Sequence, residues 1–263
     1  MNPTPPSFLE HDGVKLAYRR ASASPAHADT RHAGVVWLGG FHSDMLGEKA
    51  TLLHEAVAAT GRAYTRFDYL GHGESGGLFA AGTIGRWRSD ALAIIDQLTQ
   101  GPLVLVGSSM GGWMSLLCAL ARPERIKALV LLAPAPDFTD KLMWAGFDDN
   151  QKQQIMEQGY WTRPSPYDPA GYPITRELIE EGRTWNILDE QIPLNIPVRI
   201  LHGGLDTDVP WTHSRDLADK LASSDVVWTL IKDGDHRLSR PQDIARMIET
   251  VLPTVERVEA FLP

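Results

Sequence analysis

The sequence has little of what several protein classes require. It has one cysteine, Cys118, so an internal disulfide is excluded, and Cys118 lies in an apolar stretch where core packing is the expected role. The formal net charge is −8 and there is no basic tract, which argues against nucleic acid or an anionic membrane surface as a partner. No apolar run approaches the length of a membrane span, and the first residues do not form a secretory signal. We therefore expect a soluble cytoplasmic protein.

Sequence motifs for common cofactors are also missing. No group of His, Cys and Asp has the spacing of metal ligands. The glycine-rich stretch Gly71–Gly77 lacks the Lys-Ser/Thr ending of a phosphate-binding loop, and no G-x-G-x-x-G motif opens a helix after the first strand. The sequence therefore predicts neither a metal site nor a nucleotide, and we expect an activity without a cofactor.

Composition and alternation indicate a single α/β core. The chain has 263 residues, of which 43% are hydrophobic and 22% charged, enough for one sizeable core. Strand-like and helix-like segments alternate along most of the chain, which predicts one mostly parallel sheet flanked by helices. Between residues 138 and 194 the alternation stops, and aromatic residues and prolines gather around two expected helices, 150–158 and 175–185. We therefore predict a core of residues 1–137 and 195–263 with an insertion of residues 138–194.

A serine motif stands at the junction of a strand and a helix. Gly107–Gly111 reads G-x-S-x-G, follows the apolar run Leu103–Val106, and opens a helix-favouring stretch. In this context the turn is sharp and strained, so that Ser109 would project its hydroxyl above the sheet edge, and a Cβ at either flanking position would clash with crossing backbone. The alternative is an ordinary Gly/Ser turn. The strand–turn–helix context favours Ser109 as a nucleophile.

A serine nucleophile needs a base to accept its proton and an acid to orient that base. Asp206 follows the expected strand Val198–Leu201, and His236 follows the expected strand Val226–Ile231. Both thus lie beyond the carboxyl ends of strands, where catalytic groups collect in open α/β sheets. Asp208 is the rival acid, but it lies further from its strand end. Asp235, beside His236, is expected to be a solvated loop carboxylate.

Together these segments resemble the α/β-hydrolase superfamily of serine hydrolases, over about residues 8–251. The resemblance is carried by Gly107–Gly111 and by Phe67-Asp68-Tyr69, Leu201-His202-Gly203, Val209-Pro210-Trp211, Asp235-His236-Arg237, Arg86–Asp90 and Trp161–Ser165. It implies an α/β-hydrolase fold with a mostly parallel central sheet and a short helical lid formed by residues 138–194. It also implies the activity of a protein S-depalmitoylase that cleaves acyl glucuronides as well.

The resemblance further implies roles for individual residues. Ser109, Asp206 and His236 take the nucleophile, acid and base positions. The loop after the expected strand 34–38 would donate one backbone N–H to the oxyanion hole, from Phe41, and the residue after the nucleophile, Met110, would donate the other.

Substrate contacts are predicted less directly. His42 follows the oxyanion loop and is a candidate for touching substrate, and Trp144 and Trp161 are candidates for lining an acyl pocket beneath the lid. The expected function is hydrolysis of acyl thioesters or carboxylic esters through an acyl-serine intermediate, with an S-acylated protein among the candidate substrates. Two alternatives stay open. One is a carboxylesterase of small esters, monoacylglycerols or acyl glucuronides, and the other is a non-catalytic binding module with the same fold.

Overall fold

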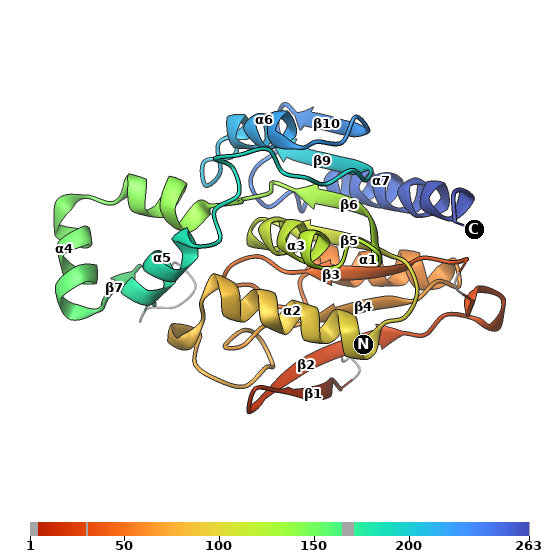
Figure 1. Ribbon diagram of the computed structural model, residues 1–263, viewed down its shortest axis with the longest axis horizontal. Helices are drawn as coiled ribbons and strands as arrows, with labels where there is room; N and C mark the ends of the chain where they lie inside the picture. Colours follow the sequence, from red (N-terminus) through yellow and green to blue (C-terminus); the bar gives the residue numbers. More distant parts are fainter. Residues whose placement is uncertain (1–4, 30, 165–170, 263) are drawn as a thin grey trace.

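The central element of the fold is an eight-stranded sheet with the strand order β1-β2-β4-β3-β5-β6-β9-β10 (Figure 1). The computed structural model describes residues 5–29, 31–164 and 171–262. From β4 to β10 neighbouring strands are parallel, whereas β1 and β2 pair antiparallel with each other and β2 pairs antiparallel with β4. The strands are β1 Ser7–His11, β2 Val14–Ala21, β3 Gly34–Leu38, β4 Tyr64–Phe67, β5 Leu103–Ser108, β6 Ile126–Leu132, β9 Val198–Gly203 and β10 Val226–Ile231. This is the mostly parallel α/β sheet that the alternation predicted.

Helices cover both faces of this sheet, which explains why its central strands are almost uniformly apolar. Every residue of β3 and of β5 is buried. Along β3, Val36 and Leu38 face one hydrophobic core with helices α2, α3 and α6, whereas Val35 and Trp37 face a second core with α1 and α7. The helices are α1 Glu48–Ala59, α2 Ile84–Leu98, α3 Met110–Ala121, α6 Trp211–Lys220 and α7 Pro241–Ala260. The sheet therefore presents its carboxyl strand ends as a fixed platform.

The last helix is longer than its sequence suggests. Pro253 by itself predicts a helix end, but α7 continues to Ala260 with Pro253 inside it. Pro253 has no N–H to donate to the preceding turn, at a cost of about 3 kcal/mol. Beyond it, Val255 and Val258 continue the apolar spacing and are buried in the core shared with α1. Burying each of them contributes about 1.5–3 kcal/mol, which offsets the lost hydrogen bond.

The segment between β6 and β9 forms a separate small layer at one end of the molecule (Figure 1). It contains a π-helical turn Thr139–Trp144, helix α4 Asp149–Gln158, strands β7 Tyr160–Arg163 and β8 Tyr172–Thr175, and helix α5 Arg176–Arg183. The two expected helices are present, but the antiparallel β7–β8 pair was not predicted. Residues 165–170 of the predicted insertion, including Ser165 of the resemblance, lie outside the described residues.

A buried aspartate closes the neck of this insertion. Asp137 has φ 57° and is completely buried. Its two carboxylate oxygens accept hydrogen bonds from the backbone N–H groups of Ile187 and Leu188, each at 2.9 Å. The chain thus leaves the core and returns to it at one point. Because one side chain joins the chain segments that enter and leave the insertion, we expect these two segments to move together.

Candidate active site

Ser109 occupies a strained turn between β5 and α3. Its backbone has φ 55° and ψ −117°, a left-handed conformation that side-chain-bearing residues rarely adopt. The glycines of the motif make this turn possible: a Cβ at Gly107 would lie 2.2 Å from the carbonyl oxygen of Gly111, and one at Gly111 would lie 2.0 Å from that of Leu38. The structure therefore gives the physical reason for both flanking glycines.

Two side chains from distant segments meet Ser109. The His236 Nε2 atom lies 3.1 Å from the Ser109 hydroxyl oxygen, across 127 residues of sequence. On the other side of the ring, Nδ1 lies 2.7 Å from Oδ2 of Asp206. Asp206 follows β9 and His236 follows β10, so neighbouring parallel strands deliver both groups to the same sheet edge. A hydrogen-bonded line thus runs from Ser109 through His236 to Asp206.

The environment of Asp206 suits it to hold a negative charge. Its side chain is completely buried, and its Oδ1 accepts the backbone N–H groups of Asp208 at 2.9 Å and Val209 at 2.8 Å. Burial alone would raise the pKa of this carboxyl, but hydrogen bonds from His202 and His236 outweigh it and hold the pKa of Asp206 well below its usual range. Of the two rival acids, Asp206 therefore carries the hydrogen bond to His236, while Asp208 is exposed and donates its backbone N–H to Asp206.

The loop after β3 packs against the nucleophile turn. A Cβ at Gly40 would lie 3.4 Å from the Cβ of Ser109, so the loop bearing Phe41 approaches the serine closely. Met110 is the first residue of α3, and such a residue has no partner within its helix for its N–H. The loop that bears Phe41 thus approaches Ser109, and the oxyanion-hole roles of the Phe41 and Met110 N–H groups remain a prediction.

His42, the next residue, is held in an unusual conformation by a second histidine. Its φ is 56°, and its backbone N–H donates to Nε2 of His72 at 3.2 Å. The other ring nitrogen of His72 donates to the carbonyl of Leu70 at 3.1 Å, which leaves Nε2 free of a proton. Burial lowers the pKa of His72 to about 4, so the ring is neutral and able to accept at neutral pH. His72 is thus a structural support of the oxyanion loop.

Aromatic rings join the insertion to this loop. Phe41 makes edge contacts with Phe79, Phe138 and Tyr172, with centroids 5.0, 5.5 and 5.9 Å away. The exposed ring of His42 stacks on Tyr172 at 4.4 Å. Tyr172 was not among the predicted substrate contacts. The aromatic content of the insertion indicated that the segment matters, but nothing in the sequence indicated which ring would reach the loop.

The two predicted tryptophans lie mainly within the insertion. Trp144 stacks beneath the guanidinium of Arg183, 5.1 Å from its ring centre, and Trp161 packs edge-on against Phe147 at 5.3 Å. Both pack against the cluster of Ile155, Ile174 and Ile179, as Phe41 and Tyr172 also do. These contacts give both tryptophans a packing role, and their predicted substrate contact remains a prediction.

Lys49 is a neighbour of the site that the sequence did not reveal. Its ammonium group donates to the hydroxyl of Ser108 at 3.2 Å and to the backbone carbonyl of Arg237. Burial lowers its pKa to about 8. Lys49 therefore ties helix α1 to the residue before the nucleophile and to the residue after His236.

A cluster of two carboxylates and a histidine at the site has the composition of a cation site. Among the described residues, Asp206, Asp208 and His236 could offer three ligand atoms that lie within 4.8 Å of one another. The His236 nitrogen nearest Asp206 is already engaged in their hydrogen bond, which a metal ion would have to replace. The sequence predicted no metal centre, and a chelator tests that prediction below.

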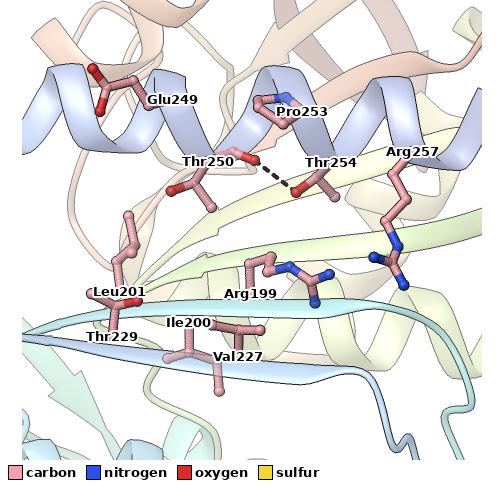
Figure 2. A pocket seen from close by; sticks show the side chains of 10 residues that line it. All are labelled: Arg199, Ile200, Leu201, Val227, Thr229, Glu249, Thr250, Pro253, Thr254 and Arg257. Atoms are coloured by element: carbon pink, nitrogen blue, oxygen red, sulfur yellow. Dashed lines mark hydrogen bonds between the residues drawn. The ribbon is translucent and has the colours of Figure 1, made fainter.

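A surface hollow elsewhere on the molecule contains none of the predicted site residues. It has a volume of about 340 Å³ and lies between α7 and the strands β9 and β10, as Figure 2 shows. Val227 and Arg199 form its floor, and Pro253 and Arg257 border it from the helix. It is thus no part of the candidate site. Within the described part of the chain, none of the helices combines the length and the hydropathy needed to cross a bilayer.

Comparison with known proteins identifies the family. The model of a family described as "Putative esterase" matches residues 95–253, and that of "Serine aminopeptidase, S33" matches residues 30–158. The mouse protein named palmitoyl-protein thioesterase ABHD10, mitochondrial, is 39% identical over 98% of this chain and 84% of its own length. Its human counterpart is 36% identical over 97% of this chain and 82% of its own length.

Solved structures agree. A hydrolase from Agrobacterium vitis S4 superposes with a TM-score of 0.88 at 39% identity, over 96% of this chain and all (100%) of that one. Mouse α/β hydrolase domain-containing protein 10 gives a TM-score of 0.85 at 37% identity, over 97% of this chain and 100% of that one.

These findings correct one expectation and confirm another. The cytoplasmic location expected from the sequence is wrong by this comparison, because the mouse, bovine and human relatives are all named mitochondrial. That expectation rested only on the absence of signals, and such an absence discriminates poorly between compartments. The resemblance in fold and family is confirmed. The chain belongs to the α/β-hydrolase family of esterases and thioesterases.

Proposed function

We propose that this protein hydrolyses acyl thioesters, in the manner of a palmitoyl-protein thioesterase, through an acyl intermediate on Ser109. The observation that carries the proposal is the hydrogen-bonded line from Ser109 to His236 to Asp206. Such a line turns a weakly nucleophilic hydroxyl into an effective one. The choice of a thioester over an oxygen ester comes from the names of the relatives that match nearly the whole chain.

The proposed mechanism has two halves. His236 Nε2 accepts the Ser109 proton as the serine oxygen attacks the acyl carbonyl carbon, and Asp206 stabilises the imidazolium that forms. The backbone N–H groups of Phe41 and Met110 stabilise the developing oxyanion, each contributing on the order of 3 kcal/mol. His236 then protonates the departing sulfur as the carbon–sulfur bond breaks. Water attacks the acyl-Ser109 ester in the second half, with His236 again acting as base and then as acid.

The insertion, residues 138–194, is proposed as a lid over this site. Support comes from the contacts of Phe138 and Tyr172 with the Phe41 ring, which continue the aromatic surface of the insertion up to the oxyanion loop. An apolar acyl chain would be desolvated against such rings, with about 0.8 kcal/mol gained per buried methylene. His42, exposed and stacked on Tyr172, is proposed to contact the acyl group or the leaving group. Trp144 and Trp161 would support this surface from behind.

A matched pair of variants tests the proposal. The purified protein should react with a fluorophosphonate probe and hydrolyse palmitoyl thioesters, and Ser109→Ala should lower kcat by about a millionfold while the thermal midpoint stays unchanged. Ser108→Ala is the control: it removes the neighbouring hydroxyl and should retain most activity. Near-native turnover in Ser109→Ala would refute the assignment.

The same assay separates the alternatives. Parallel panels of S-acyl thioesters and p-nitrophenyl esters of matched chain length should show the larger kcat/KM for the thioesters. A preference for short oxygen esters would favour a general carboxylesterase. A protein that neither reacts with the probe nor hydrolyses either panel would favour a binding module with the same fold.

A further inference from the structure

Asp206 has a second histidine neighbour. His202 lies in β9, four residues before Asp206, and is completely buried. Its Nε2 atom lies 2.9 Å from the carbonyl oxygen of Val209 and 3.1 Å from Oδ2 of Asp206. On the other side of the ring, Nδ1 lies 2.6 Å from the hydroxyl oxygen of Ser214, which is completely buried in α6. The ring thus bridges the acid, its loop and a helix.

The chemistry of these neighbours fixes where the proton of the His202 ring resides. A carbonyl oxygen and a carboxylate oxygen can only accept, so Nε2 must carry the hydrogen and share it between Val209 and Asp206. A neutral ring then presents an unprotonated Nδ1, to which the Ser214 hydroxyl donates. The acceptors at Nε2 therefore fix the tautomer of His202, and the Ser214 hydroxyl satisfies the other ring nitrogen.

The geometry points to His202 as a positioning residue of the proposed hydrolysis, with Ser214 as the hydrogen-bond partner that anchors the other side of its ring. His202 holds the Asp206 carboxylate and the turn from Asp206 to Val209 in place, so that Oδ2 stays on the Nδ1 hydrogen of His236. This assignment rests on the proposed function. It extends the line of hydrogen bonds to five side chains, Ser214, His202, Asp206, His236 and Ser109.

Two features of the turn explain why one side chain can control it. Val209 is held through both of its backbone polar groups, since its N–H donates to Oδ1 of Asp206 and its carbonyl accepts from His202. Oδ2 of Asp206 lies against two histidine nitrogens, and among the hydrogen bonds that lower the pKa of Asp206 the one from His202 is the largest. Loss of the Nε2 hydrogen would therefore free both the carboxylate and the turn. A displacement of about 1 Å at a catalytic group can cost about 100-fold in rate.

Two substitutions of similar polarity separate positioning from mere packing. In His202→Gln the terminal amide nitrogen reaches the place of Nε2 and can still donate to Asp206. In His202→Asn the shorter amide reaches only the place of Nδ1, so the contact with Ser214 survives but the donor to Asp206 is lost. Both variants remove a buried ring and should lower the thermal midpoint by similar amounts.

The expected difference is in kcat. On an acyl thioester His202→Asn should lose about 10- to 100-fold in kcat with KM within about twofold, whereas His202→Gln should stay within about fivefold of wild type. Ser214→Ala, which keeps the ring but removes the hydrogen-bond partner of its Nδ1, should lower kcat by about three- to tenfold. This third variant keeps the inference testable where a His202 variant does not fold.

A spectroscopic readout makes the test independent of turnover. The hydrogen between His236 Nδ1 and Asp206 Oδ2 should give a downfield proton resonance that His202→Gln retains and His202→Asn loses or shifts. Unchanged resonance and kcat in His202→Asn, or equal losses in the Gln and Asn variants, would overturn the inference. A wild type that hydrolyses no acyl substrate, yet whose resonance responds as described, would refute the proposed function and leave the positioning role of His202 supported.

Discussion

The sheet core and the insertion hold their functional side chains by different means. In the core, Ser109, Asp206 and His236 lie beyond the ends of β5, β9 and β10, so the pairing of parallel strands sets their separation. In the insertion, three buried isoleucines make a small core, and Phe138 and Tyr172 contact the Phe41 ring with their own rings. Backbone hydrogen bonding thus fixes the reactive groups, and side-chain packing fixes the surface that a substrate meets.

The connection between the two regions reinforces this difference. Besides the Asp137 neck, Glu181 of α5 accepts the backbone N–H of Gly85 at the start of α2, at 2.9 Å, and the indole N–H of Trp185, at 2.5 Å. A carboxylate at a helix N-terminus is favourably placed. The insertion is therefore anchored by polar contacts at its base, while its aromatic face packs against Phe41 through ring contacts. Substitutions in the core should change the rate of the chemistry, and substitutions on that face should change which acyl chains are accepted.

The largest expected effect lies in the core. Asp206→Asn should lower kcat by about 1,000- to 10,000-fold, because the amide stabilises the imidazolium poorly and favours the wrong tautomer of His236. Asp208→Asn is the control and should stay within about threefold, since Asp208 is exposed and the variant keeps its backbone N–H on Asp206. Steady-state kinetics on one thioester measure both. Comparable losses in the two variants would show that the acid has been misassigned.

A smaller and more selective effect is expected in the insertion. Tyr172→Ala removes the ring stacked on His42 and should lower kcat/KM for palmitoyl thioesters by about tenfold, with acetyl thioesters changed by less than about twofold. The plot of log kcat/KM against chain length should therefore flatten.

Trp144→Ala provides the contrast for Tyr172→Ala. Trp144 packs on Arg183 inside the insertion, so its loss should lower the thermal midpoint more than it changes chain-length preference. If Trp144→Ala flattens the profile more than Tyr172→Ala does, the division between packing and substrate-facing rings is wrong. A flat profile in the wild type would instead indicate a small or polar acyl group.

The free energy of unfolding should depend on pH because His72 is buried as a neutral ring. Burial lowers its pKa to about 4 in the folded protein, against about 6.5 when unfolded. Between these values the unfolded chain binds more protons, so the free energy of unfolding contributed by His72 is present above pH 6.5 and falls as the pH decreases toward 4. Asp68 opposes this trend, because burial raises its pKa to about 6.

A comparison with His72→Gln isolates that contribution, because Asp68 is common to both proteins. Urea unfolding at each pH measures the free energy of unfolding of the two proteins. Between pH 7 and pH 4.5 the wild type should lose about 2 kcal/mol more of this free energy than His72→Gln does. The glutamine oxygen can still accept the His42 N–H, so activity at pH 7 should change little. A pH-independent difference would mean that His72 is not buried as a neutral base.

The smallest expected effect is that of a chelator. Because hydrolysis by Ser109, His236 and Asp206 needs no metal, prolonged treatment with a chelator should change kcat/KM by less than about twofold. Loss of activity that added zinc restores would show that the group of Asp206, Asp208 and His236 holds a cation in the active protein.

Local signals explain what could be predicted. The strained turn at Ser109 is encoded by its two glycines within five residues, and the central strands by uninterrupted apolar runs that a sheet covered on both faces requires. The positions of Asp206 and His236 followed from their place just past such strands. In each case the physical cause lies within a few residues of its effect.

Other features depend on neighbours far away in the chain. Helix α7 continues past Pro253 because Val255 and Val258 are buried in the core beyond it. Strand β7 forms because it pairs with β8. Pro253 by itself indicates a helix end, so the local signal was overruled by burial.

The amino-acid sequence by itself determined the α/β order of the elements, the strained serine turn and the two residue types that must reach it. Only the tertiary structure decided that His202 and Ser214 stand behind the Asp206 carboxylate and that Tyr172 reaches the loop bearing Phe41. The reason is physical. Backbone conformation and hydrophobic period are local properties, whereas the choice among chemically similar side chains depends on distances of an ångström, which the packing of the whole chain sets.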